Sequence, residues 1–546
     1  MTETAVNRKS GWISFFLVLT IIAVFSYLMV RTFLFILAPY FWYEKIVAMF
    51  LLLAEGFILI HSIGYFLNVY RVIRHSGTEK ASLDIPEDLD FYPPVAVIVS
   101  SFKEPLDVLE DTITCFYNLT YPNKRIYFLD DTRYDLPGQD REEMEKYRRD
   151  IENMCREIGV HLFRREWRGA KAGMINDFLD FIEENPKEGF TFFPFGGEIR
   201  GEKEKYIIVF DADMNPFPDF IEPLVAMMEQ NPMLAFIQTP QYYSNFEKNR
   251  VARGSGLQQA IFYEYICEGK SIQDAMFCCG TNVIFRREAL MDVGGFDESS
   301  VTEDFATSLR FHKNGWQSAY VGKVCAFGMG PEDLGGYFKQ QFRWALGTVG
   351  LFREILKNFV KNPWMLPPSK WWEYFLSGTH YFIGWVFFTL VYCPILFLFF
   401  NVPSYLAYPH VFFLFFTPYI ILALTIFAAT LHSRRYTVRD MLQGILLNAV
   451  SFPVYMKASL LAMLGVKGTF GITPKGGSNA LPLTGLWPQI LTLLIAFGAV
   501  IWGVHRLIYE RETAIAVVIN SFWSLYHVAI ILGVLYFNYP VETEDI

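Results

Sequence analysis

The sequence predicts an α/β domain inserted between membrane-spanning α-helices. Apolar blocks occupy both ends of the 546-residue chain, and the mixed block between them alternates strand-like with helix-like patterns. Hydrophobic residues make up 52% of the chain and charged residues only 19%, a balance that indicates membrane spans. The formal net charge of −9 argues against a nucleic-acid-binding protein.

Three blocks divide the chain: an N-terminal hairpin over residues 1–70, a mixed domain over 71–370 and a C-terminal apolar region over 371–546. The first apolar run is longer than the core of a signal peptide, so we expect an uncleaved helix. The expected spans are 12–36, 46–70, 376–401, 408–431, 486–506 and 514–538.

A further apolar stretch, residues 441–464, is interrupted by Asn448, Pro453 and Lys457. A lysine at mid-bilayer is costly, and a proline removes a helical backbone bond. We therefore expect an amphipathic helix in the membrane interface instead of a seventh span.

Basic residues set the expected orientation of the six spans. Arg434 and Arg435 indicate that their connection lies in the cytoplasm, and the even number of spans then places both termini there. Arg506 and Arg511, at an expected outer turn, point the other way.

The mixed block has the pattern of a mostly parallel sheet covered by helices on both faces. Its β-rich runs are 95–101, 125–131 and 205–213, and its helical stretches include 142–158 and 173–184. Two of the runs end in acidic pairs, Asp130-Asp131 and Asp211 with Asp213. Ligands bind at the carboxyl ends of strands in such sheets, so these carboxylates mark the candidate site.

The D-x-D pattern of Asp211 and Asp213 suits a divalent cation. Hard ions such as Mg²⁺ or Mn²⁺ take carboxylate ligands together with substrate phosphates, and a departing nucleoside diphosphate needs such charge stabilisation. The seven cysteines contain no C-x-x-C pair, which argues against a zinc or redox motif. The alternative is two solvated aspartates in a loop after a strand.

Two later clusters complete the pattern. Asp304, in Thr302-Glu303-Asp304, has the chemistry of a general base for an acceptor hydroxyl, although Thr302 or Asp304 could instead cap a helix. In the Q-Q-F-R-W segment, Arg343 suits a diphosphate and Trp344 offers a flat face to a sugar ring. The alternative is an amphipathic helix with its tryptophan in the membrane interface.

The four clusters, in the order D-D, D-x-D, T-E-D and Q-x-x-R-W, resemble the family-2 processive glycosyltransferases, which include cellulose, hyaluronan and chitin synthases. Four further segments resemble motifs of that group, over residues 95–538 in all. They are Lys171-Ala172-Gly173 with Asn176 (K-A-G-x-N, one residue inserted), Gln238-Thr239-Pro240 (Q-T-P), Phe277 to Thr281 (F-F-C-G-S) and Phe470 to Lys475 (F-x-V-T-x-K). The last is similar to the gating loop of bacterial cellulose synthase catalytic subunits.

The resemblance implies a GT-A-like, Rossmann-like domain and assigns roles to its residues. Asp304 would be the base, with Asp211, Asp213 and Glu303 also catalytic, and Asp213 would hold Mg²⁺ or Mn²⁺. The implied donor-binding residues are Ser101, Glu104, Asp130, Asp131, Lys171, Asp211, Gln340, Arg343, Thr473 and Lys475. The implied acceptor-binding residues are Trp344, Cys279, Gly280, Thr281 and Glu303. A gating loop over 468–477 would close over the nucleotide.

The function implied is processive, inverting elongation of a β-linked polysaccharide, with glucan and UDP-glucose favoured, and translocation of the product. Growing polysaccharide, membrane lipids and accessory export or regulatory subunits would be partners, at the cell membrane. Thr132 and Met214 depart from the cellulose synthase pattern, and no cyclic-di-GMP-binding domain is expected after the last span.

Two alternatives remain open at this stage. One is transfer of a single sugar to a membrane lipid, since ceramide glucosyltransferases resemble the same core. The more distant one is a transporter or channel, for which Glu55 and His61 in the second span are the ionisable candidates.

Overall fold

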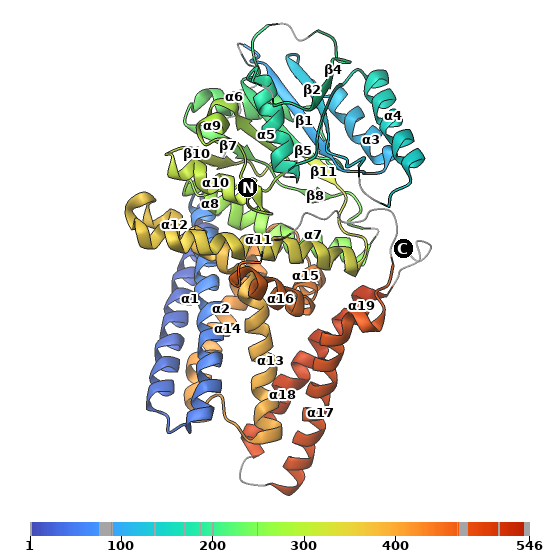
Figure 1. The fold of residues 1–546 in the computed structure, drawn as a ribbon. Coiled ribbons are helices and arrows are strands. Elements are labelled where there is room, and N and C mark those ends of the chain that lie inside the picture. Colours follow the sequence, from blue (N-terminus) through green and yellow to red (C-terminus); the bar gives the residue numbers. More distant parts are fainter. Residues whose placement is uncertain are drawn as a thin grey trace.

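The computed structural model describes residues 3–75, 89, 91–135, 138–168, 170–185, 187–198, 201–247, 249–466, 468, 479–510 and 514–539. An α/β domain stands at one end of a bundle of long helices, and several helices lie across the junction between them (Figure 1). The predicted fold class, an α/β domain between apolar helices, is confirmed.

The elements follow one another in three groups. The N-terminal hairpin is α1 (Glu3–Leu37) and α2 (Trp42–His75). The strands are β1 (Val95–Ser101), β2 (Lys124–Asp130), β3 (His161–Arg165), β4 (Phe190–Phe193), β5 (Tyr206–Asp211), β6 (Asn215–Pro216), β7 (Leu234–Gln238), β8 (Tyr242–Tyr243), β9 (Val283–Arg286), β10 (Gln317–Tyr320) and β11 (Ala326–Gly328). The helices of the domain and junction are α3 (Leu106–Tyr117), α4 (Arg141–Ile158), α5 (Ala170–Ile182), α6 (Ile221–Gln230), α7 (Arg250–Ile261), a π-helical turn (Phe262–Cys267), α8 (Glu268–Ile272), α9 (Arg287–Asp292), α10 (Glu303–Lys313), α11 (Leu334–Lys361) and α12 (Pro368–Thr379). The C-terminal helices are α13 (Ile383–Phe400), α14 (Pro409–Ser433), α15 (Val438–Val450), α16 (Phe452–Met463), α17 (Trp487–Tyr509), α18 (Ala514–Ile531) and α19 (Gly533–Asn538), with short 3₁₀ turns at Pro363–Met365, His380–Phe382 and Leu483–Leu486.

The main sheet has eight strands in the order β10-β7-β9-β5-β1-β2-β3-β4. Strands β5, β1, β2 and β3 are parallel, whereas β4 and β9 run antiparallel to their neighbours. The β1 register sets Ser101 opposite Asp130 and Ser100 opposite Asp211. The acidic strand ends predicted from the sequence therefore share one edge of the sheet.

Alternation along β1 builds a core on each face of the sheet. Val95, Val97 and Val99 pack with residues of α3, α4 and α6, while Ala96 and Ile98 pack with residues of α5, α9 and α10. These five side chains of β1 are completely buried, as expected for a sheet covered on both faces.

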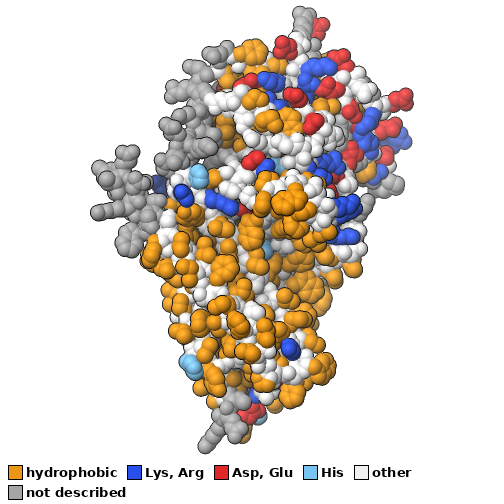
Figure 2. Space-filling view, turned by 90° about the vertical axis from the view of Figure 1, so that its left-hand side faces the viewer, with side chains coloured by type: hydrophobic (Ala, Val, Ile, Leu, Met, Phe, Trp, Pro, Cys, Tyr) orange, Lys and Arg blue, Asp and Glu red, His pale blue; other side chains and the backbone are white. Residues whose placement is uncertain are grey.

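The helical part has the surface of a membrane protein. Hydrophobic side chains cover its visible face almost completely, while charges of both signs gather over the α/β domain (Figure 2). Six helical segments of the described chain are long and apolar enough to cross a membrane. They are Ser14–Leu37, Trp42–His75, Pro368–Phe400, Pro409–Ser433, Leu483–Tyr509 and Ala514–Asn538, close to the six expected spans.

The stretch predicted as one interface helix, residues 441–464, is instead two helices. Helices α15 and α16 meet at Ser451 with a bend of 49°, and together they could count as one broken span or a re-entrant segment. Pro453 lies in the first turn of α16, where its missing N–H is tolerated, but it cannot continue the hydrogen bonds of α15. The proline therefore explains the break.

Arg506, whose charge disagreed with the expected topology, is a buried structural residue. Its guanidinium donates to the carbonyls of Phe397 and Leu398, at 2.9 and 3.1 Å, in the last turn of α13. Cations stabilise the exposed carbonyls at a helix C-terminus, so this arginine completes α13.

A buried ion cluster joins the N-terminal hairpin to the α/β domain. Glu373 of α12 pairs with Arg71 of α2 at 2.7 Å and with Lys270 of α8 at 3.0 Å. Glu373 and Lys270 are almost fully buried. Removing one partner of such a cluster leaves the other charge buried and unpaired, which is strongly destabilising. The cluster therefore holds the junction in one arrangement.

Candidate active site

A cavity of about 190 Å³ opens at the carboxyl edge of the sheet, between the α/β domain and α11. It brings together most of the residues predicted from the sequence. Those in its lining are Glu104, Asp131, Lys171, Asp211, Asp213, Cys279, Gly280, Glu303, Asp304, Gln340, Arg343 and Trp344.

Asp211, predicted to be catalytic, ends β5 and accepts a charged hydrogen bond from Lys171 Nζ. Lys171 also donates to the carbonyl of Gly280 at 2.9 Å. Burial lowers the pKa of Lys171, but Asp211 and Glu303 outweigh it, so the net shift is upward. The cavity thus contains a permanent ammonium group beside the D-x-D motif.

Asp304 lies in the first turn of α10, beside Glu303. Thr302 is at the N-cap position but makes no capping hydrogen bond, whereas Asp304 Oδ1 accepts from the Phe305 N–H at 2.7 Å and so satisfies one N–H group of the first turn. Burial and the neighbouring Glu303 raise the pKa of Asp304 to about 7. A carboxyl group with this pKa can accept a proton near neutral pH, as a general base must.

The F-C-C-G-T loop forms the floor beside Asp304. Gly280 has a φ of +83°, and a Cβ there would come within 3.0 Å of Asp304 Oδ2. Gln238 of Q-T-P holds the loop, because its amide donates to the Thr281 carbonyl and accepts from the Cys279 N–H, both at 2.8 Å. Position 280 therefore requires glycine, because its backbone has a positive φ and the nearby Asp304 carboxylate leaves little room for a Cβ.

Helix α11 carries Gln340, Arg343 and Trp344 along the opposite wall. The helix approaches the T-E-D segment at Gly347, where a Cβ would come within 2.5 Å of Thr302. Gln340 Oε1 is buried and has no hydrogen-bond partner among the described residues. Such an unpaired acceptor suits a hydroxyl group of a ligand.

Among the predicted site residues that the structure describes, three do not line the cavity. Asp130 turns away from it, pairing with Arg164 and accepting from the Tyr134 hydroxyl, both at 2.7 Å. Thr281 is buried behind the wall, where its hydroxyl accepts from the Asp211 N–H, and Ser101 donates to Glu104 at 2.5 Å. Consecutive side chains of a strand point to opposite faces, so the D-D pair could not supply two cavity ligands.

The neighbouring Asp131 does face the cavity and pairs with Arg165 at 3.2 Å. Burial raises its pKa to about 7 although Arg165 lowers it. Its predicted role in donor binding stays a prediction.

The chain is similar to known proteins over most of its length. The model of glycosyl transferase family group 2 matches residues 206–430. A UDP-forming cellulose synthase catalytic subunit of Pseudomonas fluorescens is 27% identical over 455 residues, which are 80% of this chain and 56% of that protein. These matches support a glycosyltransferase domain of family group 2 in a chain that is similar to cellulose synthase catalytic subunits.

The chain is also similar to a second cellulose synthase and to one solved structure. A putative cellulose synthase of Komagataeibacter xylinus is 26% identical over 520 residues, 90% of this chain and 30% of that protein. The chain therefore spans about half of the first relative and under a third of the second. A solved mannosyltransferase of Pyrobaculum calidifontis, in complex with GDP-Man and Mn²⁺, has a TM-score of 0.46 and 16% identity, covering 76% of this chain and 99% of that one.

Several residues of the cavity wall were not predicted from the sequence. Gln241 and Tyr243 follow Q-T-P, and Met329 and Glu332 precede α11. Asn176, the last residue of the K-A-G motif, has a structural task, because it accepts from the Phe296 N–H at 2.7 Å. Their position just after the Q-T-P motif was the sequence signal that could have identified Gln241 and Tyr243. The predicted gating-loop residues Thr473 and Lys475 lie outside the described residues.

The carboxylates of the cavity fit a divalent ion that the donor would help to bind. Within the described ranges, no group of three or more His, Cys, Asp or Glu side chains could hold a metal by itself. Asp211 and Asp213 line one cavity, however, and Mg²⁺ characteristically binds one or two carboxylates together with substrate phosphates and water. The residues present therefore suit a metal–diphosphate site, with Asp213 as the predicted ligand.

Proposed function

We propose that this chain is a processive, inverting glycosyltransferase that elongates a β-linked glucan from UDP-glucose. The supporting observation is a single cavity that combines Asp304, the Lys171–Asp211 pair, and Arg343 and Trp344 of α11. The similarity to UDP-forming cellulose synthase subunits favours UDP-glucose as the donor.

In the proposed reaction, the terminal hydroxyl of the acceptor attacks the anomeric carbon of the donor sugar. Asp304 takes the hydroxyl proton while the bond between that carbon and the diphosphate breaks. Lys171 and Arg343 stabilise the negative charge that develops on the departing UDP. A single displacement inverts the anomeric carbon, so an α-linked donor gives a β-linked product.

The acceptor would lie against α11. Trp344 provides a flat apolar surface for the terminal sugar ring, and Gln340 Oε1 is a buried acceptor suited to one of its hydroxyl groups. A divalent ion held by Asp213 would neutralise the diphosphate when the donor is bound.

We place the catalytic domain in the cytoplasm and the product on a path across the membrane. Arg71 and Arg434 both contact residues at the domain end of the bundle, at 2.7 Å from Glu373 and 2.8 Å from Glu268. Basic residues concentrate on the cytoplasmic side of membrane proteins. Helices α1 and α19 also begin and end, respectively, at this end of the bundle (Figure 1). Accessory export or regulatory subunits would be further partners.

The ionisable residues that suggested a transporter are engaged inside the protein. Glu55 pairs with Arg31 at 2.6 Å and accepts from the Tyr27 hydroxyl at 2.9 Å. The ring nitrogens of His61 contact the carbonyls of Phe57 and Leu376, at 3.0 and 3.3 Å. These contacts favour a structural role for both residues.

The decisive experiment is incubation of the purified, membrane-reconstituted chain with a panel of radiolabelled nucleotide sugars. We expect UDP-glucose to yield long chains that a β-glucan-specific glycosidase digests, and EDTA to abolish synthesis. Glucose on a lipid without chain growth would support single-sugar transfer instead. Incorporation from another donor, or full activity in EDTA, would contradict the corresponding part of the proposal.

A further inference from the structure

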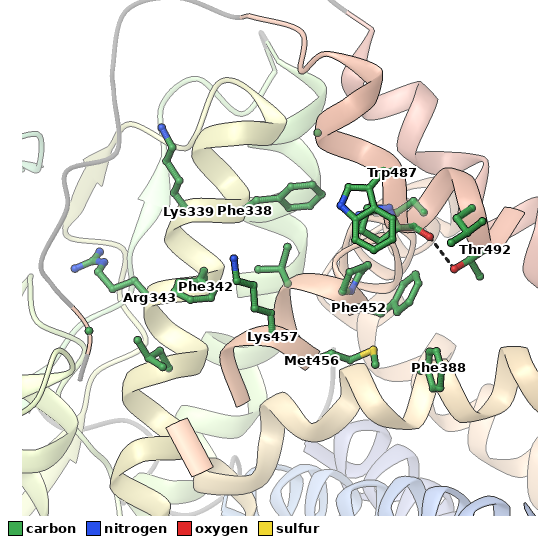
Figure 3. Close-up of a pocket in the computed structure, with 18 of the residues that line it drawn as sticks. Phe338, Lys339, Phe342, Arg343, Phe388, Phe452, Met456, Lys457, Trp487 and Thr492 are labelled. Carbon is green, nitrogen blue, oxygen red and sulfur yellow. Dashed lines mark hydrogen bonds between the residues drawn. The ribbon is translucent and has the colours of Figure 1, made fainter. Parts of the chain in front are cut away.

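A second, larger cavity of about 960 Å³ lies next to the active-site cavity, between α11, α13, α16 and the start of α17 (Figure 3). The two cavities share Val301 and Arg343 in their linings. Phe342 of α11 lines the larger cavity and Trp344 lines the active-site cavity, so the two cavities lie on different faces of this helix and meet at Arg343.

This interfacial cavity is mainly apolar. Aromatic rings from four helices surround it, among them Phe342, Phe388, Phe452 and Trp487, and Met456 adds a flexible thioether (Figure 3). Such a surface is favourable for hydrocarbon and offers few partners to the many hydroxyl groups of a sugar polymer.

The polar groups deep in the cavity are mostly committed to protein hydrogen bonds. The Thr492 hydroxyl donates to the Pro488 carbonyl at 2.7 Å, and the Gln489 amide donates to the Val450 carbonyl at 3.0 Å. Gln489 Oε1 is buried without a partner among the described residues, so one ligand hydroxyl has an acceptor here.

The charges in the lining are all positive. Lys339, Arg343 and Lys457 contribute cations, and no carboxylate occurs among the described lining residues. Lys457 Nζ lies 5.7 Å from the centre of the Phe342 ring, and Figure 3 shows this side chain between Phe342 and Phe452. Lys339 is exposed at the rim. The cavity therefore complements an anion carrying a large apolar group.

The depth of the cavity matches the layers of a bilayer leaflet. Lys457 and Gln489 belong to α16 and the first turn of α17, at the junction with the α/β domain. Phe388 and Tyr392 lie farther along the span Pro368–Phe400, toward the middle of the bundle. Cations at the polar level and aromatic rings at hydrocarbon depth match a lipid headgroup and its acyl chains.

We propose that this cavity is a binding site for an anionic glycerophospholipid. Its phosphate lies at Lys457 and Lys339, its acyl chains lie among Phe342, Phe388 and Met456, and a headgroup hydroxyl donates to Gln489 Oε1. Lipid binding at this site does not require turnover of the sugar donor, so this proposal can be tested independently of the proposed glycosyl transfer. A lipid there also forms part of the wall beside Arg343.

Photo-crosslinking of the full chain in nanodiscs tests the proposal. The discs contain phosphatidylcholine with a trace of photoactivatable phosphatidylglycerol, and labelled peptides are mapped by mass spectrometry. We expect labels on α16 and the first turns of α17. A Lys339→Gln/Lys457→Gln double variant should lose about tenfold of this labelling, since hydrogen bonds to charged groups contribute this much.

The matched control is Lys361→Gln, an exposed lysine at the end of the same helix α11 and outside the cavity, which should keep wild-type labelling. Met456→Trp fills the apolar part without changing charge and should also reduce labelling. Equal labelling in all variants, or equal labelling by a phosphatidylcholine probe, would overturn the proposal. Polymer synthesis measured on the same discs reports separately on the proposed function.

Discussion

At the scale of single residues, the cavity separates two kinds of carboxylate. Asp211 is neutralised by Lys171, whereas Asp304 has an acidic neighbour, Glu303, and a raised pKa. Opposite environments for nearby carboxylates are the usual way in which a site divides charge stabilisation from proton transfer. The arrangement therefore supports Asp304, and not Asp211, as the base.

Asp304→Asn tests this assignment most directly. We expect the rate of sugar transfer to fall by about 10²–10⁴-fold, the usual contribution of a general base, with donor binding nearly unchanged. Initial rates and calorimetric binding of UDP-glucose measure the two effects. Glu298→Gln, a nearby carboxylate outside the cavity lining, should keep wild-type turnover. Wild-type rates in the Asp304 variant would show that another group is the base.

The pH profile gives a second test. Because the pKa of Asp304 is raised to about 7, the carboxyl stays protonated and inactive at lower pH, so turnover should rise with pH through about 7. Glu303→Gln removes the neighbouring negative charge and should move this rise to lower pH. Initial rates over a pH series measure both midpoints. A flat profile would contradict the role of Asp304 as the base. An unchanged midpoint in the variant would contradict the effect of Glu303 on the pKa of Asp304.

At the scale of elements, the site depends on how closely α11 approaches the T-E-D segment. Gly347 permits contact with Thr302, whereas a Cβ added at Gly350, one turn away on the same helix, would meet no atom within 4 Å. The two glycines therefore differ in the space around them and share a helical backbone.

Alanine at each position separates packing from helix propensity. Gly347→Ala should push α11 from Thr302, destabilise the fold by about 1–3 kcal/mol and reduce turnover. Gly350→Ala should stabilise the helix by up to about 1 kcal/mol and leave turnover unchanged. Thermal unfolding in detergent and initial rates measure the pair. Equal behaviour of both variants would mean that close approach at Gly347 is not needed.

At the scale of the whole molecule, the bent pair α15–α16 decides the topology. If the pair returns to the side from which it starts, Val438 and Leu464 share the side of the α/β domain, while Tyr408 lies at the opposite end. All three side chains are well exposed, at 68%, 71% and 74%.

Cysteine labelling in intact cells can establish this arrangement. We expect Val438→Cys and Leu464→Cys to react only with a membrane-permeant reagent, and Tyr408→Cys to react with an impermeant one. The unsubstituted chain, whose own cysteines are mostly buried, provides the background. Impermeant labelling at Leu464 alone would mean that the pair spans the membrane.

Periodic patterns along the chain were enough to predict much of this fold. Hydrophobic runs predicted six apolar helices, and alternating patterns predicted β1, β2, β5, α4 and α5 with shifts of at most a few residues. The acidic strand ends met at one edge because parallel strands must present their carboxyl ends together. These features depend on periodicity and short-range geometry, which a sequence records directly.

Contacts between distant segments became visible only in the folded chain. It selected Asp131 over Asp130 for the cavity, because Arg164 holds Asp130 on the other face of the sheet. It brought Lys171 to Asp211, and it formed the interfacial cavity from α11, α13, α16 and α17, which are far apart in the chain. Side-chain pairing and cavity shape arise from packing between distant segments, and no local pattern encodes them.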